Sequence, residues 1–433
     1  MDPLARTLNN QILESSPAVF DCLSEEGKNM FYPAGILTQA AEAKEKAKKF
    51  DATIGIAIEQ GDPMHLAVTR RFFNELDLHQ IYTYAPPGGR PKLREFWKES
   101  MICRNPTLTG KAISLPMVTN ALTHGLCVAG ELFVGPNDVV LIPDKNWGVY
   151  RLNFMTRKGG RIETFPMFNA KDGFNTKGLE NHLAREAKKR KKVVLILCFP
   201  NNPTGYTPLK NEVHEIYRIV REQAEKGTTI VVLSDDAYFG LFYENSFKES
   251  LFSGFCDLHE NVLAVKLDGA TKESYVWGFR TGFITFGNKT PHPDKLYSAL
   301  EMKAQGVIRS TVSSCNHVSQ SIIETVLREP EYQKNLDEKY DIMKGRALRL
   351  KRILNNEKYK KYWKYYPFNS GYFMCLKLRD VNAETLRLHL LDTYGVGTIS
   401  TSDTDLRIAF SCIEEDQIEE LVELIFQATR DLS

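Results

Sequence analysis

The 433-residue chain lacks any long apolar run. The longest is Val193–Phe199, whereas a helix that spans a membrane needs about 20 consecutive apolar residues. The first ten residues, MDPLARTLNN, also lack the apolar core of a signal peptide. We therefore expect a soluble protein of the cytoplasm that has no membrane partner.

An excess of charge of one sign is also missing. The sequence has 56 Lys and Arg against 54 Asp and Glu, which gives a net charge of +2. Such a balance provides no basic footprint for nucleic acid, so we expect no nucleic-acid partner. Hydrophobic residues make up 42% and charged residues 25%, which are ordinary globular values, and the length predicts at least two packed units.

Patterns typical of disulfide scaffolds and metal sites are absent as well. The eight cysteines are far apart and none belongs to a C-x-x-C pair, so reduced thiols are expected. The nine histidines contain no His-x-x-x-His spacing, which argues against a catalytic zinc helix. We predict no metal.

Short apolar runs alternate with amphipathic stretches between about residues 110 and 290. A helix is predicted at Asn211–Lys226. Continuous apolar runs separated by helices indicate a mostly parallel sheet covered on both faces, here of about seven strands. The runs that we interpret as strands are Ser114–Thr119, Val139–Ile142, Val193–Phe199, Thr229–Leu233, Val262–Leu267 and Gly282–Phe286.

The two ends of the sequence predict a smaller α+β unit. The first thirty residues favour short amphipathic helices interrupted at Pro17, and residues 316–354 favour one long helix or two that break near Pro330. Further elements are predicted at Thr38–Lys49 (helix), Gly371–Leu376 and Leu406–Phe410 (strands) and Glu414–Arg430 (helix). We expect an N-terminal arm with part of the small domain at 1–55, a large domain at 56–310 and a small C-terminal domain at 311–433.

Polar residues follow several of the predicted strands. In open α/β sheets ligands bind at the carboxyl ends of the strands, so these residues are candidates for one site. They are Asn202 in PNNPTG, Asp235 and Tyr238 in SDDAYFG, Lys272 in DGATKESYVWGFRTG, and Ala121, Leu122 and Thr123 at a helix start.

Lys272 is the most informative of these candidates. Burial of a lysine lowers the pKa of its amine, and amines tuned in this way form Schiff bases with carbonyl compounds. Asp235 and Arg280 suggest partners for a ring nitrogen and a phosphate. An aldehyde, a basic ring nitrogen and a phosphate together describe pyridoxal 5′-phosphate (PLP).

With these motifs in this order, nearly the whole chain resembles class I/II aminotransferases of PLP fold type I, the aspartate-aminotransferase-like superfamily. The resemblance implies an α/β large domain with a mostly parallel seven-stranded sheet, and a smaller α+β domain. It also implies transfer of an amino group between an L-amino acid and a 2-oxoacid in amino acid metabolism, by a homodimer with shared active sites.

The resemblance assigns roles around the cofactor. Lys272 would form the Schiff base and then act as general base and acid, and Arg280, eight residues later, would clamp the phosphate. Asp235 would keep the ring nitrogen protonated, while Tyr238 and Asn202 would donate hydrogen bonds to the ring 3-oxygen. Each assignment has a plainer alternative, such as a surface lysine, a surface ion pair or a simple Asn-Pro turn.

Further implied residues complete the cofactor site. Trp147 in KNWGVY would stack on the ring, although a core tryptophan is the alternative. Ala121, Leu122 and Thr123 would bind the phosphate through backbone N–H groups. The family often has serine where this chain has Gly269, so fewer hydroxyls should touch the phosphate unless Thr123 or Thr271 compensates.

The resemblance also implies residues that meet the substrate or the second subunit. Tyr84 in YAPPGGRPKLR would reach the phosphate of the neighbouring subunit, and Arg407 in LRIAFS would bind the substrate α-carboxylate. Gly35 and Ile36 resemble a segment that closes over the substrate. Arg309 aligns with an arginine that binds a side-chain carboxylate, which would make aspartate or glutamate with 2-oxoglutarate natural substrates; a structural arginine at the dimer interface is the alternative.

Two other functions compete with transamination. The same Schiff base could serve a PLP-dependent lyase or decarboxylase, because the protein surroundings choose which bond breaks. A non-catalytic PLP-binding sensor domain is a third possibility, although few residues precede the family match to hold a DNA-binding module.

Overall fold

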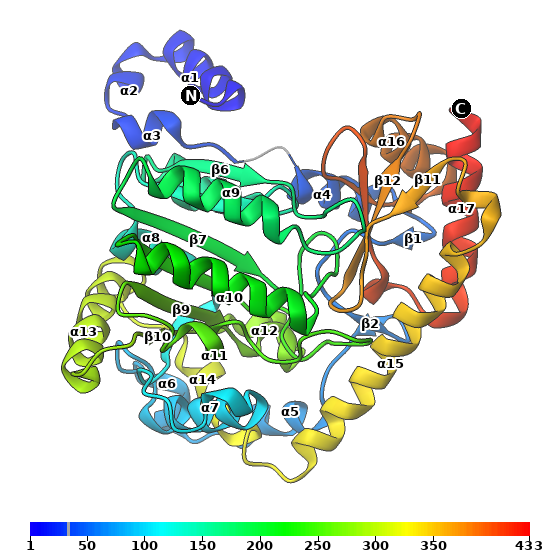
Figure 1. Cartoon of the computed structure of the whole chain (residues 1–433). Coiled ribbons are helices and arrows are strands. Elements are labelled where there is room, and N and C mark those ends of the chain that lie inside the picture. Colours follow the sequence, from blue (N-terminus) through cyan, green and yellow to red (C-terminus); the bar gives the residue numbers. More distant parts are fainter. Residues whose placement is uncertain (33–34) are drawn as a thin grey trace.

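The computed structural model describes residues 1–32 and 35–433 (Figure 1). Its helices are α1 (Pro3–Ser15), α2 (Pro17–Asp21), α3 (Glu25–Asn29), α4 (Ile36–Lys46), α5 (Ala67–Arg71), α6 (Leu78–Tyr82), α7 (Pro91–Arg104), α8 (Ala121–Phe133), α9 (Thr176–Ala187), α10 (Lys210–Glu225), α11 (Phe252–Phe255), α12 (Ala270–Glu273), α13 (Pro293–Thr311), α14 (His317–Val326), α15 (Glu331–Leu354), α16 (Ala383–Tyr394) and α17 (Ile418–Asp431). No described helix is long and apolar enough to cross a membrane.

A seven-stranded sheet forms the centre of the molecule, in the order β4-β10-β9-β8-β7-β5-β6. The strands are β4 (Met117–Asn120), β5 (Val139–Pro143), β6 (Arg161–Phe165), β7 (Lys192–Cys198), β8 (Thr229–Asp235), β9 (Val262–Asp268) and β10 (Thr281–Gly287). Only β10 runs antiparallel to its neighbours. The predicted mostly parallel sheet is confirmed, but β6 was missed because it is an edge strand in which only Phe165 is buried.

Both faces of this sheet are buried, and neighbouring side chains of one strand serve opposite faces. On β7, Val194 and Ile196 pack with residues of α8 and α13, whereas Val193, Leu195 and Leu197 pack with residues of α9 and α10. This double burial explains why the strand reads as an unbroken apolar run in the sequence. Figure 1 shows α9 and α10 lying across the near face of the sheet.

A second sheet of four antiparallel strands lies beside the first, in the order β11-β12-β15-β14. The remaining strands are β1 (Phe50–Asp51), β2 (Ile58–Glu59), β3 (Asp62–Pro63), β11 (Trp363–Tyr365), β12 (Phe373–Leu378), β13 (Val396–Gly397), β14 (Ile399–Ser400) and β15 (Asp405–Ala409). The predicted break near Pro330 separates α14 from α15. β1 pairs with β13, which ties the N-terminal segment to the C-terminal unit.

Candidate active site

A cavity of about 340 Å³ lies between the seven-stranded sheet and the four-stranded sheet. Parallel pairing places the ends of β7 and β8 side by side, with Cys198 opposite Asp235. The cavity is lined by most of the residues that the sequence singled out, namely Asn202, Asp235, Tyr238, Lys272, Arg280, Arg407, Trp147, Ala121, Leu122 and Thr123.

Asp235 ends β8 and is 2% exposed. One carboxylate oxygen accepts a hydrogen bond from the Tyr150 hydroxyl at 2.7 Å, and the other accepts from the Ala237 N–H at 3.1 Å. Burial raises the pKa of Asp235, while the Tyr150 hydrogen bond and nearby Lys272 act in the opposite direction. The site therefore holds a desolvated carboxyl group whose charge depends on its few partners.

Lys272 lies on the single turn α12, directly after β9. Its amine is 4.7 Å from the centre of the Tyr238 ring. Burial lowers the pKa of Lys272, although Asp235 partly opposes this effect. A larger uncharged fraction of the amine favours its action as a nucleophile and as a base.

Arg407 on β15 reaches the cavity from the four-stranded sheet. Its guanidinium donates to the Asn202 side-chain oxygen at 3.1 Å and to the Thr53 carbonyl at 2.6 Å, and it lies 4.3 Å from the centre of the Phe373 ring. Its Nε has no partner among the described residues. Burial lowers the pKa of Arg407 to about 10, so the group is still a cation at neutral pH.

The start of α8 also lines the cavity. Ala121 has a φ of +61°, a left-handed conformation that is uncommon for a residue with a side chain. Free N–H groups at a helix start attract anions. A Cβ atom on Gly269 would lie 2.6 Å from the Thr281 carbonyl oxygen, so packing against β10 explains why serine is missing there.

Three predicted residues do not line this cavity. Tyr84 is 91% exposed, and Arg309, on α13, is exposed and donates to the Ser313 hydroxyl at 2.7 Å. Gly35 precedes α4, whose Ala40 does line the cavity. Of the predicted closing segment, the side chain of Ile36 is not described, and neither are Pro33 and Ala34, which precede Gly35. The roles of Tyr84, Arg309 and Gly35 stay predictions.

The structure adds residues that the sequence reasoning missed, namely Tyr150, Thr53, Ile54, Cys198, Trp277 and Phe373. Tyr150 follows Trp147 by three residues, a spacing at which one helical turn brings two side chains to the same side. The sequence could therefore have indicated that Tyr150 lies near Trp147. The carbonyl of Thr53 gave none, because any residue type supplies a carbonyl.

A buried cluster of charges lies behind the cavity. Lys266 pairs with Asp236 at 2.5 Å and with Asp268 at 2.9 Å, and Arg104 pairs with Glu273, the residue after Lys272. Burial raises the pKa of Asp236 to about 6 and that of Glu273 to about 7. Three carboxyl groups thus face two cations, and burial favours the protonated forms of Asp236 and Glu273.

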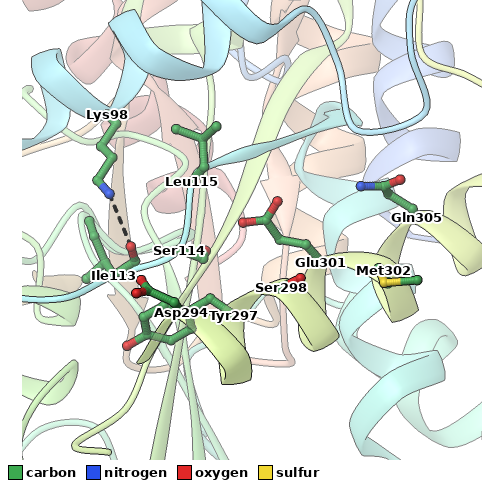
Figure 2. A pocket seen from close by; sticks show the side chains of 10 residues that line it. All are labelled: Lys98, Ile113, Ser114, Leu115, Asp294, Tyr297, Ser298, Glu301, Met302 and Gln305. Carbon is green, nitrogen blue, oxygen red and sulfur yellow. Dashed lines mark hydrogen bonds between the residues drawn. The ribbon is translucent and has the colours of Figure 1, made fainter. Parts of the chain in front are cut away.

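A second groove, of about 380 Å³, lies between α7, residues 113–115 and α13 (Figure 2). Figure 2 shows the Lys98 amine directed at the Ile113 carbonyl, to which it donates at 3.1 Å. Glu301 is paired with Arg94 at 2.6 Å. None of the site residues singled out by the sequence lines this groove, so we place the chemistry in the first cavity.

Comparison with known proteins decides the family. The family model for aminotransferase class I and II matches residues 56–425. The chain belongs to this family. This membership agrees with the order of the motifs around Asn202, Asp235 and Lys272 along the chain.

Curated relatives in the family are distant. An aspartate aminotransferase of Streptomyces avermitilis is 25% identical over 57% of this chain and 58% of its own length, so the chain aligns with little more than half of that relative. A probable N-acetyl-LL-diaminopimelate aminotransferase of Bacillus subtilis is 23% identical over 83% of this chain and 85% of its own length. The two names differ in substrate, so they do not fix the substrate of this chain.

Solved structures share the fold. An aminotransferase from Anaerococcus prevotii superposes with a TM-score of 0.84 at 21% identity, covering 94% of this chain and 99% of that one. A Thermus thermophilus aspartate aminotransferase mutant gives a TM-score of 0.74 at 18% identity, covering 94% and 99%. The predicted fold of the aspartate-aminotransferase-like superfamily is confirmed.

Proposed function

We propose that this protein is a PLP-dependent aminotransferase that moves an amino group between an L-amino acid and a 2-oxoacid. The observation that carries the proposal is the meeting of Lys272, Asp235 and Arg407 around one cavity, in a member of the aminotransferase class I and II family. A partly buried amine, a buried carboxyl group and a buried guanidinium suit a carbonyl, a basic ring nitrogen and a carboxylate.

The residues present fit PLP. The cavity volume of about 340 Å³ falls in the usual range for small-molecule sites of about 300–1,000 Å³. Trp147 offers an aromatic face, Asp235 an acceptor, and the start of α8 with Arg280 a set of donors for a phosphate. When bound, PLP supplies an electrophilic carbonyl carbon and a ring that withdraws electrons.

The chain supplies binding, orientation and proton transfer. Arg407, held by Asn202 and the Thr53 carbonyl, binds the substrate α-carboxylate and thereby fixes the direction of the Cα–H bond. Lys272 removes the proton from the substrate Cα and later delivers it to the cofactor's former carbonyl carbon. The lowered pKa of Lys272 suits its amine to both transfers. Asp235 keeps a proton on the ring nitrogen, and Tyr150 orients Asp235.

We also propose a cytoplasmic homodimer. Large hydrophobic side chains are exposed on α6, the loop after it and α13, namely Leu78 (72%), Tyr82 (79%), Tyr84 (91%) and Met302 (70%). A second copy that covers them would bury apolar area, which favours association. Tyr84 would then reach the site of the second copy. Sedimentation equilibrium should give twice the mass of the chain; a monomer would contradict this proposal.

We propose aspartate or glutamate as donor and 2-oxoglutarate as acceptor. Among the described residues that line the cavity, the cations are Lys272, Arg280 and Arg407, which have other tasks. We therefore assign the side-chain carboxylate to Arg309 of the second copy. Arg309→Ala should raise KM for aspartate by roughly 30-fold or more, the equivalent of about 2 kcal/mol, and leave KM for alanine nearly unchanged. Equal effects on both substrates would refute this role.

The function is tested by mapping the lysine that bears the cofactor. PLP-loaded protein is reduced with borohydride, digested and analysed by mass spectrometry. We expect the cofactor on Lys272, its loss in Lys272→Ala together with transamination, and its retention in Lys98→Ala, which alters a lysine outside the cavity. A cofactor on another lysine, or an active Lys272→Ala variant, would contradict the assignment.

A further inference from the structure

An ion pair joins the two sheets beside the cavity. The Lys145 amine lies 2.7 Å from a carboxylate oxygen of Asp405, and their side chains are 18% and 2% exposed. Lys145 follows β5 of the seven-stranded sheet, whereas Asp405 begins β15 of the four-stranded sheet. The pair therefore links two structural units in a place that is largely closed to water.

Aromatic groups and hydroxyls fix the geometry of this pair. The other oxygen of Asp405 accepts from the Tyr366 hydroxyl at 3.0 Å and from the Thr404 hydroxyl at 3.2 Å. The Lys145 amine lies 5.1 Å from the centre of the Tyr366 ring, which in turn stacks on Phe168. With these partners, the desolvated Asp405 has little freedom to turn away from Lys145.

Each partner lies two residues from a residue of the cavity. Trp147 follows Lys145 by two residues, and Arg407 follows Asp405 by two residues on the same face of β15. The Lys145 carbonyl accepts from the Asn201 side chain at 3.1 Å, and the neighbouring Asn202 accepts from Arg407 at 3.1 Å. Three side-chain contacts, together with the backbone that joins Asn201 to Asn202 and Asp405 to Arg407, thus link these residues in a ring.

We propose that Lys145 and Asp405 are positioning residues, which hold Arg407 at a fixed place relative to Trp147 so that a substrate carboxylate and the ring face are correctly spaced. This inference rests on the proposed function. Loss of the pair lets β15 shift against the loop after β5. Misplacement of a substrate-binding group by about 1 Å can cost up to about 100-fold, so we expect KM for the amino acid to rise roughly 10- to 100-fold.

The test uses Lys145→Met, Asp405→Asn and the double variant in the full-length, PLP-loaded protein. Each single variant should raise KM for the amino acid far more than it lowers kcat, and the double variant should be little worse than either one. Lys145→Arg should recover most of the affinity. The matched control is Lys364→Met, because Lys364 on β11 pairs with Asp172 at 3.5 Å in an exposed contact between the same two units; it should leave KM unchanged.

A second measurement does not depend on catalysis. In the cofactor-free protein, amide hydrogen exchange in residues 405–409 and 144–147 should be faster in Asp405→Asn than in wild type, and unchanged in Lys364→Met. Faster exchange with a raised KM supports the proposal. An active enzyme whose variants keep the wild-type KM, even with a lowered Tm, overturns it, as does unchanged exchange. If the wild-type protein shows no transamination, the proposed function is refuted instead. The exchange data then still test whether the Lys145–Asp405 pair holds the two segments in place.

Discussion

Removal of the Tyr150 hydroxyl tests how the site controls the charge of Asp235. Both side chains are almost fully buried and the hydrogen bond between them is 2.7 Å long. A bond to a charged acceptor is worth about 1.5–3 kcal/mol, whereas a bond between neutral partners is worth about 0.5–1.5 kcal/mol. Tyr150→Phe should therefore lower the free energy of unfolding by about 1.5–3 kcal/mol where Asp235 is ionised, and by less at acidic pH where it is neutral.

The sign follows from which form of the carboxyl group the hydroxyl stabilises. Tyr150 donates to the carboxylate and so lowers the pKa of Asp235 against the effect of burial; Tyr150→Phe raises that pKa. The folded variant then keeps its proton to a higher pH, so its stability declines more steeply as pH rises. Affinity for PLP should fall as well, because a neutral Asp235 pairs poorly with a protonated ring nitrogen.

Urea unfolding of the cofactor-free protein over a pH series that extends to the acid limit of folding, with PLP affinity from equilibrium dialysis, measures both effects. Tyr206→Phe is the matched control, because it removes a 2.6 Å bond from a buried hydroxyl to the carboxylate of Glu212, outside the cavity. It should cost comparable stability and leave PLP affinity unchanged. A loss of stability for Tyr150→Phe that is the same across the whole pH series, or equal losses of PLP affinity in the two variants, would refute the reasoning.

Two further predictions concern the residues around Lys272. Gly269→Ser should lower the Tm and weaken PLP binding, although it adds a hydroxyl, because its Cβ would press on the Thr281 carbonyl; tighter binding would show that the packing argument is wrong. Glu273 has its pKa raised to about 7 from an ordinary value of 4.5, so the folded protein holds a proton there that the unfolded chain releases, and stability is lost as pH rises from about 4.5 to about 7. In urea titrations Glu273→Gln should flatten that decline; an unchanged slope would place the retained proton elsewhere.

The sheet, and the cavity residues that follow its strands, were largely predictable from the sequence. Strands such as β7 and β8 are buried on both faces and are written as unbroken apolar runs, and the residues that follow them must meet at one edge. β6 was not predicted, because an edge strand that is not fully buried needs no such apolar run. The hydrophobic pattern and the parallel order of the strands were therefore sufficient to predict a cavity residue wherever that residue directly follows a strand.

Contacts between the two sheets could not be predicted in this way. The pair Lys145 and Asp405 is 260 residues apart in sequence, and neither residue type nor spacing marks it. The Thr53 carbonyl that holds Arg407 is a backbone group, and every residue type has one, so the sequence could not indicate this contact. Such features depend on how the surfaces of the two sheets meet, and only the three-dimensional structure supplies that information.

The most direct test of the account is the absorption spectrum of the PLP-loaded protein, titrated with single amino acids in the absence of a 2-oxoacid. We predict that the band of the lysine-bound cofactor is lost on addition of an amino donor and returns on addition of a 2-oxoacid, because the amino group is stored on the cofactor between the two half-reactions. A band that persists while ammonia, pyruvate or carbon dioxide is released would contradict transamination. A protein that takes up no PLP would contradict the site itself.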